Sequence, residues 1–170
     1  MATSVSAPTT RSYDSTRAYQ DGIIAGVLAA CAVALWFLLF DITRGRPLYT
    51  PSVLGTALFG RGASLAPLEA SPISMEMVLM FTWVHGMVFA ALGGIAARLL
   101  AVAERSPHVG FGIILLFVIF EACFTVAAFL IAAPVIHALT WPAVLVANLL
   151  AAAVMGGYLW SRHPSLRMAP

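Results

Sequence analysis

The stretch GIIAGVLAACAVALWFLLFD, residues 22–41, decides the fold of this chain. It is apolar or small from its first residue to the closing Asp41. About 20 residues at 1.5 Å each cover the roughly 30 Å of hydrocarbon in a bilayer. The run is longer than the apolar segment of a signal peptide, and no clear small-residue cleavage site follows it. We therefore expect a retained helix that crosses a membrane.

The composition of the whole chain extends this prediction. Of its 170 residues, 61% are hydrophobic and only 9% are charged, whereas soluble domains carry about 25% charged residues. Such a chain cannot cover a water-exposed surface with polar groups, so its expected solvent is a membrane. The net charge of +2 does not indicate nucleic-acid binding, and nothing in the sequence indicates a soluble substrate.

Further apolar segments give the predicted architecture. We expect an all-α, polytopic membrane protein with four transmembrane helices in a bundle, at about 22–41, 76–99, 109–133 and 142–160. A polar N-terminal tail, 1–19, would precede this 20–164 domain, and a C-terminal tail, 165–170, would follow it.

The longest connection, 42–74, contains the sequence GRPLYTPSVLGTALFG at 45–60. Thr50 is a suitable N-cap, Pro51 suits a first helical turn, and Gly60 can end a helix. A helix over about 50–60 is too short to span a bilayer. We therefore expect an interfacial or re-entrant helix in this loop.

The distribution of arginine predicts an orientation. Basic residues favour the cytoplasmic side of a membrane, and the predicted topology puts six of the nine arginines on the side of both termini. We therefore expect a bacterial inner (cytoplasmic) membrane protein with cytoplasmic termini and a periplasmic 42–74 loop.

Small residues at four-residue spacing predict how the helices pack. In lipid, helices associate where small side chains let their backbones approach closely. An equally open alternative is that alanine is simply common in this chain. The predicted contact residues are Gly22, Gly26, Ala30, Ala34, Gly86, Ala90, Gly94, Ala147 and Ala151.

An acid interrupts the apolar segment LLFVIFEACFTVAAFL, residues 115–130. A charge at mid-bilayer costs at least about 2.5–3.5 kcal/mol, so Glu121 should be protonated, paired or near water. His85 and Asn148 lie at a similar predicted depth. Thr82 can share the helix face of His85, and Thr125 can share that of Glu121. Three interpretations stay open: a polar tie between helices, a proton or ion pathway, or haem or pigment ligation by His85.

Other polar residues have simpler interpretations. The sequence holds no catalytic motif and no metal-ligand spacing, so we expect neither an enzyme nor a metal site. Asp41 and Glu76 are interpreted as surface charges at helix ends. Contacts to lipid headgroups or to a partner protein are expected from Arg44, Arg46, Tyr49 and Trp141.

Several segments together resemble a group of small bacterial four-helix membrane proteins without an assigned activity. These are ALWFLLFDITRGRPLYTPSVLGTALFG, VHGMVFAALGGIAARLL, ERSP, FVIFEACF and ANLLAAAVMGGYLWSRHP. More weakly, the chain resembles accessory subunits of bioenergetic complexes, including photosynthetic reaction-centre and light-harvesting assemblies. The resemblance implies a non-catalytic subunit that packs against a larger membrane complex and lipids. It requires no cofactor, although lipid, carotenoid or (bacterio)chlorophyll from neighbours could bind. The alternatives are a small oligomeric transporter using His85, Glu121 and Asn148, and a haem or chlorophyll protein.

Overall fold

The computed structural model describes residues 15–60, 72–105 and 141–162. Their regular structure is entirely helical, which confirms the all-α prediction for this part of the chain. The helices are α1 (Ser15–Thr43), α2 (Tyr49–Phe59), α3 (Met75–Arg105) and α6 (Trp141–Arg162). Helix α1 begins inside the expected polar tail, and α3 continues six residues beyond its expected end at 99.

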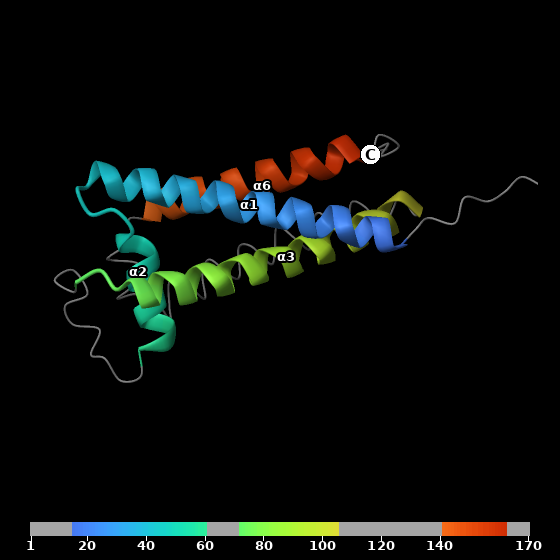
Figure 1. The fold of residues 1–170 in the computed structure, drawn as a ribbon. Coiled ribbons are helices and arrows are strands. Elements are labelled where there is room, and N and C mark those ends of the chain that lie inside the picture. Colours follow the sequence, from blue (N-terminus) through green and yellow to red (C-terminus); the bar gives the residue numbers. More distant parts are fainter. Residues whose placement is uncertain (1–14, 61–71, 106–140, 163–170) are drawn as a thin grey trace, which may run out of the picture.

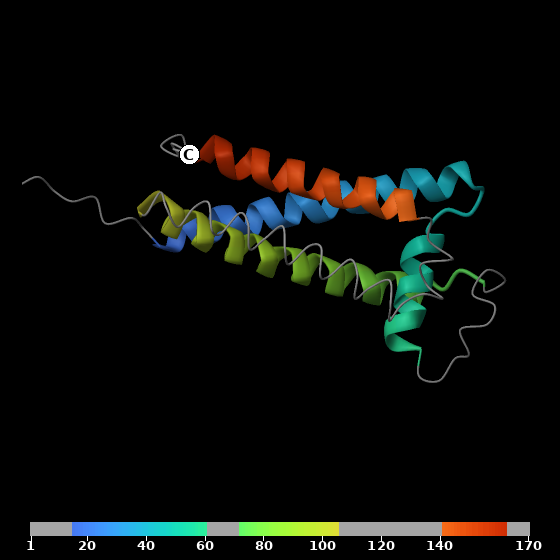
Figure 2. The same cartoon turned by 180° about the vertical axis from the view of Figure 1, so that it is seen from behind.

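Three of the helices, α1, α3 and α6, are long and apolar enough to cross a membrane. They run alongside one another, with α1 between α3 and α6 (Figures 1 and 2). These are three of the four predicted crossings, and the fourth, 109–133, lies outside the described residues. The structure thus supports a protein with several membrane-spanning helices.

The polar ends of α1 match the thickness of a bilayer. Asp21 and Asp41 both lie on this helix, and the segment between them contains no charged residue. At 1.5 Å per residue they are separated by about 30 Å along the axis, close to the thickness of the hydrocarbon core.

Helices α1 and α3 cross at a very close distance because glycine lies on both sides of the contact. A Cβ atom added to Gly26 would overlap the Phe89 carbonyl, and one added to Gly93 would overlap the Gly22 carbonyl. The Cβ atom added to Gly26 would also lie only 3.0 Å from the Ala90 Cα. Close approach of this kind is the main source of attraction between helices in lipid.

The structure corrects part of the predicted small-residue stripe. The glycine of α3 at this crossing is Gly93, which was not among the predicted contact residues. Among the described residues, an added Cβ on Gly94 would reach only the Tyr19 ring, at 3.9 Å, and one on Gly86 would meet nothing within 4 Å. Ala34 is exposed, whereas Ala30 is buried. On α3 the predicted Ala90 therefore lies at the crossing, whereas Gly93 takes the place that was expected for Gly94.

Small residues also line the contact between α1 and α6. Ala143 and Ala147 are buried, whereas Ala151 is only partly buried. Near the far end of α6, Leu159 joins Ala25 of α1 and Ala97 of α3 in a buried apolar cluster. All three long helices therefore meet at this end of the bundle.

Helix α2 lies across the opposite end of the bundle (Figure 1). Its range, Tyr49–Phe59, with Gly60 as the C-cap residue, confirms the short helix expected at about 50–60. The turn that leads into it is a Schellman motif, in which the Arg46 amide donates to the Asp41 carbonyl at 3.0 Å and the Gly45 amide to the Ile42 carbonyl at 2.9 Å. Gly45 has φ of +69°, a conformation that glycine adopts without steric cost.

Candidate functional site: polar contacts between the helices

A buried aspartate connects the end of α1 to the start of α2. Asp41 is only 1% exposed. Its Oδ2 accepts a hydrogen bond of 2.7 Å from the Thr50 amide, and its Oδ1 accepts one of 2.8 Å from the Thr50 hydroxyl. The Asp41 carboxyl therefore holds both donors of one residue on the next helix.

This contact replaces the local cap that α2 lacks. The N-cap residue, Leu48, makes no side-chain cap hydrogen bond, and amides in a first helical turn have no partner within the helix. The Tyr49 amide donates to the Arg46 carbonyl, Asp41 accepts from Thr50, and Pro51 carries no amide hydrogen. A carboxylate at this position also interacts favourably with the positive end of the helix dipole.

The prediction that Asp41 is a surface charge was therefore wrong. Thr50 also does not cap the helix as expected, because its hydroxyl binds Asp41 from the first turn. Local helix-end signals do not identify this contact, because the cap of α2 comes from the preceding helix.

Two further contacts hold α2 against α3. The Ser52 hydroxyl accepts a hydrogen bond of 3.0 Å from the Ser74 amide, immediately before α3. A Cβ atom on Gly55 would overlap the Met77 carbonyl, so the two helices touch through their backbones here. Helix α2 is thereby fixed to both neighbouring helices.

The first turn of α6 belongs to the same end of the bundle. Trp36 Nε1 donates a hydrogen bond of 2.9 Å to the Ala143 carbonyl. Val144, Phe37 and Leu54 pack against a buried apolar pair formed by Tyr49 and Val53. Asp41 and this apolar cluster together join α1, α2 and α6.

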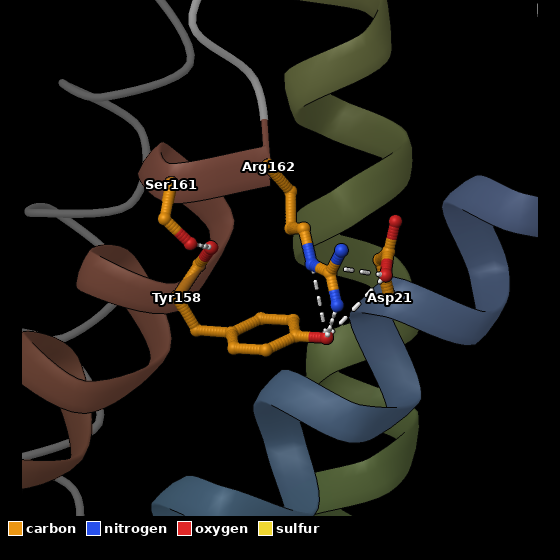
Figure 3. A network of polar contacts seen from close by, with 4 residues as sticks. All are labelled: Asp21, Tyr158, Ser161 and Arg162. Atoms are coloured by element: carbon orange, nitrogen blue, oxygen red, sulfur yellow. Dashed lines mark hydrogen bonds and ion pairs between the residues drawn. The ribbon is translucent and has the colours of Figure 1, made fainter.

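The opposite end carries a more exposed polar network (Figure 3). The Tyr158 hydroxyl donates to Asp21 Oδ1 at 3.4 Å and accepts from Arg162 Nη2 at 3.1 Å. Arg162 Nε lies 3.7 Å from Asp21 Oδ1, with the arginine side chain 54% exposed. Figure 3 shows the Arg162 and Tyr158 side chains reaching from α6 toward Asp21 on α1.

His85 lies in the interior of α3 and contacts α1. Its Nε2 donates a hydrogen bond of 3.3 Å to the Ala30 carbonyl. Its ring centroid lies 5.6 Å from that of Phe81 and 4.6 Å from that of Phe89. The imidazole therefore packs within an aromatic environment, with Nε2 directed to a backbone acceptor.

Of the partners predicted for His85, the structure describes Thr82 and Asn148. Glu121 and Thr125 lie outside the described residues. The Thr82 hydroxyl donates to the Val78 carbonyl of its own helix at 2.7 Å. Asn148 is exposed on α6, which lies on the other side of α1 from α3. Among the described residues, the partner of His85 is a backbone carbonyl that periodicity alone cannot identify.

The residues expected to contact lipid or a partner protein divide into two groups. Arg44 and Trp141 are exposed, and the Arg44 guanidinium lies 4.3 Å from the centroid of the Phe40 ring. Arg46 is partly buried and lies 4.1 Å from the centroid of the Tyr49 ring. Tyr49 is itself buried, so its ring packs inside the protein rather than against lipid.

Within the three described ranges, no group of three or more His, Cys, Asp and Glu side chains is placed to hold a metal ion. Comparisons with protein-family models, curated proteins and solved structures gave no match. The family resemblance noted in the sequence stays a prediction.

Proposed function

We propose that the chain is a non-catalytic structural subunit of a larger bacterial membrane complex. One observation carries the proposal: three polar side chains of the described bundle each bond to a neighbouring helix, while large apolar side chains face outward. Asp41, His85 and Trp36 each bond to a neighbouring helix. Their polar atoms stabilise the fold and are directed into the protein.

The outward faces favour contact with other apolar surfaces. Trp83 of α3 is 71% exposed and Leu149 of α6 is 62% exposed. In a membrane, such side chains contact lipid tails or neighbouring helices, and aromatic side chains supply large contact areas in protein interfaces. A subunit that packs beside larger partners would use these faces.

The arrangement of the described helices supports a fourth crossing at 109–133. Helix α3 ends beside the start of α1, since Arg98 contacts Tyr19. Helix α6 begins beside the end of α1, since Trp36 contacts Ala143. The chain that links α3 to α6 must therefore return from one end of the bundle to the other. We propose the four-helix bundle with α2 as an interfacial helix on this basis.

The proposed setting is the bacterial inner membrane, with both termini cytoplasmic and the 42–74 loop periplasmic. The arginine distribution supports this orientation. Helix α2 lies at the end of the bundle opposite the Asp21 network, which agrees with an interfacial position on the periplasmic side.

Two alternatives make different demands on His85. A transporter would need an aqueous path lined by His85 together with Glu121 and Asn148, and the exposed position of Asn148 on α6 does not favour one. A haem or chlorophyll protein would have to ligate through Nδ1, because Nε2 donates to the Ala30 carbonyl. It would also need room for a macrocycle beside the Phe81 and Phe89 rings that pack against the imidazole. A structural subunit requires neither an aqueous path nor a bound haem or chlorophyll.

The proposal is tested by purifying the native protein in a gentle detergent and measuring its mass spectrum and visible absorption together. Stoichiometric recovery with a larger membrane complex is expected, and any visible absorbance should survive His85→Ala. A colourless oligomer of this chain alone would contradict the proposal. Loss of absorbance in His85→Ala would instead favour pigment or haem ligation.

A further inference from the structure

Tyr19 and Arg98 form a polar pair at the end of the bundle that carries Asp21. The Arg98 Nη1 donates a hydrogen bond of 2.8 Å to the Tyr19 hydroxyl. The guanidinium carbon lies 5.9 Å from the centroid of the Tyr19 ring. Tyr19 comes from α1 and Arg98 from α3, so the pair bridges two helices at their exposed surface.

The partner of Arg98 in this pair is neutral. Tyr19 accepts a hydrogen bond but contributes no negative charge, in contrast to Arg162, whose Nε lies 3.7 Å from the Asp21 carboxylate. Because the Tyr19 oxygen accepts from Arg98, its own hydroxyl proton can be donated to a further acceptor. The pair therefore offers a positive charge and a phenolic donor side by side.

The depth of the pair matches the headgroup layer of a membrane. Tyr19 lies 22 positions before Asp41 on the same helix, which is about 33 Å at 1.5 Å per residue, slightly more than the roughly 30 Å of hydrocarbon. Toward the middle of the bundle, Ile23 and Ile95 follow the pair on the same helix faces and are 47% and 56% exposed. These apolar residues lie where acyl chains would continue from a headgroup.

We propose that Arg98 and Tyr19 bind the phosphate of an anionic phospholipid. Arginine donates several hydrogen bonds to phosphate oxygens in a fixed planar geometry, and Tyr19 adds a further donor. The acyl chains lie along Ile23 and Ile95. Phosphatidylglycerol carries a net negative charge, whereas the choline group of phosphatidylcholine neutralises its own phosphate. Because Tyr19 does not balance the positive charge of Arg98, the site prefers phosphatidylglycerol.

The experiment measures binding of each lipid to the purified full-length chain by native mass spectrometry in detergent. Arg98→Gln should weaken phosphatidylglycerol binding about fivefold, as expected for the loss of one cation near a membrane surface. Tyr19→Phe should weaken it about threefold, because one hydrogen bond is lost. Arg98→Lys keeps the charge and should retain most of the binding, which separates a lipid site from a folding defect.

Arg44 supplies a matched control at the other end of the bundle. It is also exposed and also stacked on an aromatic ring, but Phe40 has no hydroxyl group. Arg44→Gln should weaken phosphatidylglycerol binding clearly less than Arg98→Gln does, because Arg44 has no phenolic donor beside it to share a phosphate. Equal losses in Arg44→Gln and Arg98→Gln, wild-type binding by Arg98→Gln, or equal affinity of the wild type for the two lipids would each overturn the proposal.

Discussion

The two ends of the bundle are both held by an aspartate of α1, but in different ways. Asp41 is 1% exposed and binds two donors of Thr50 at 2.7 and 2.8 Å. Asp21 is partly exposed and binds Tyr158 at 3.4 Å and Arg162 at 3.7 Å. A buried, fully paired carboxylate is costly to disturb, whereas an exposed ion pair contributes little. We therefore expect the α2 end to be more rigid than the opposite end.

The largest effect should come from the crossing of α1 and α3, which lies between the two ends of the bundle. Gly26→Leu should lower the free energy of unfolding by about 3 kcal/mol, because a side chain cannot fit against the Phe89 carbonyl. Unfolding in detergent, followed by circular dichroism, measures this loss. Gly86→Leu is the matched control, since its added Cβ meets nothing within 4 Å among the described residues. Equal losses in both variants would contradict the close crossing.

Next in size is the loss of the buried tie at the α2 end. Asp41→Ala should lower the free energy of unfolding by about 2 kcal/mol, because two donors of Thr50 lose their acceptor in a buried position. Hydrogen exchange should increase first in α2, which depends on this cap. Wild-type protection of the Thr50 amide in the variant would contradict the assignment of Asp41 as its cap.

A smaller effect is expected where α2 meets α3. Ser52→Ala removes the acceptor of the Ser74 amide and should cost about 1 kcal/mol. The same unfolding assay measures it, and Ser52→Thr, which keeps a hydroxyl, serves as the control. A loss as large as that of Asp41→Ala would show that this contact, rather than Asp41, dominates the α2 end.

The smallest effect should come from the exposed end. Tyr158→Phe removes the hydroxyl that joins Asp21 and Arg162, yet the thermal midpoint should stay within about 1 °C of the wild type. Differential scanning fluorimetry is sensitive enough to test this. A shift similar to that of Asp41→Ala would remove the contrast between the two ends.

Helix positions could be predicted from the sequence because hydrophobic length is a local property. Residues 22–41, 76–99 and 142–160 all lie within long helices, and the short helix at 50–60 was also recognised from its proline and glycine. The rotation of each helix about its own axis could be predicted less closely than its position along the chain. A shift of one position turns a helix by about 100°, which is enough to exchange Gly94 for Gly93 at the crossing.

Contacts between distant residues were harder to predict. Asp41 precedes a glycine-containing turn and a helix whose first turn contains Thr50, and this pattern is the only sequence signal for the cap. His85 was recognised as an unusual residue in an apolar helix, but its partner among the described residues is the Ala30 carbonyl. Backbone acceptors are present at every position, so the sequence does not distinguish one from another.

A paired unfolding measurement on Asp41→Asn and Asp21→Asn, each at low and high salt, tests most directly whether the two ends differ in this way. Salt screens exposed charges but has little effect on buried ones. Asp41→Asn should lower the free energy of unfolding by about 1 kcal/mol at both salt concentrations, since an amide has one acceptor oxygen for two donors. Asp21→Asn should have a small effect that disappears at high salt. Equal losses in the two variants, or a loss in Asp41→Asn that high salt abolishes, would contradict a buried tie at the α2 end.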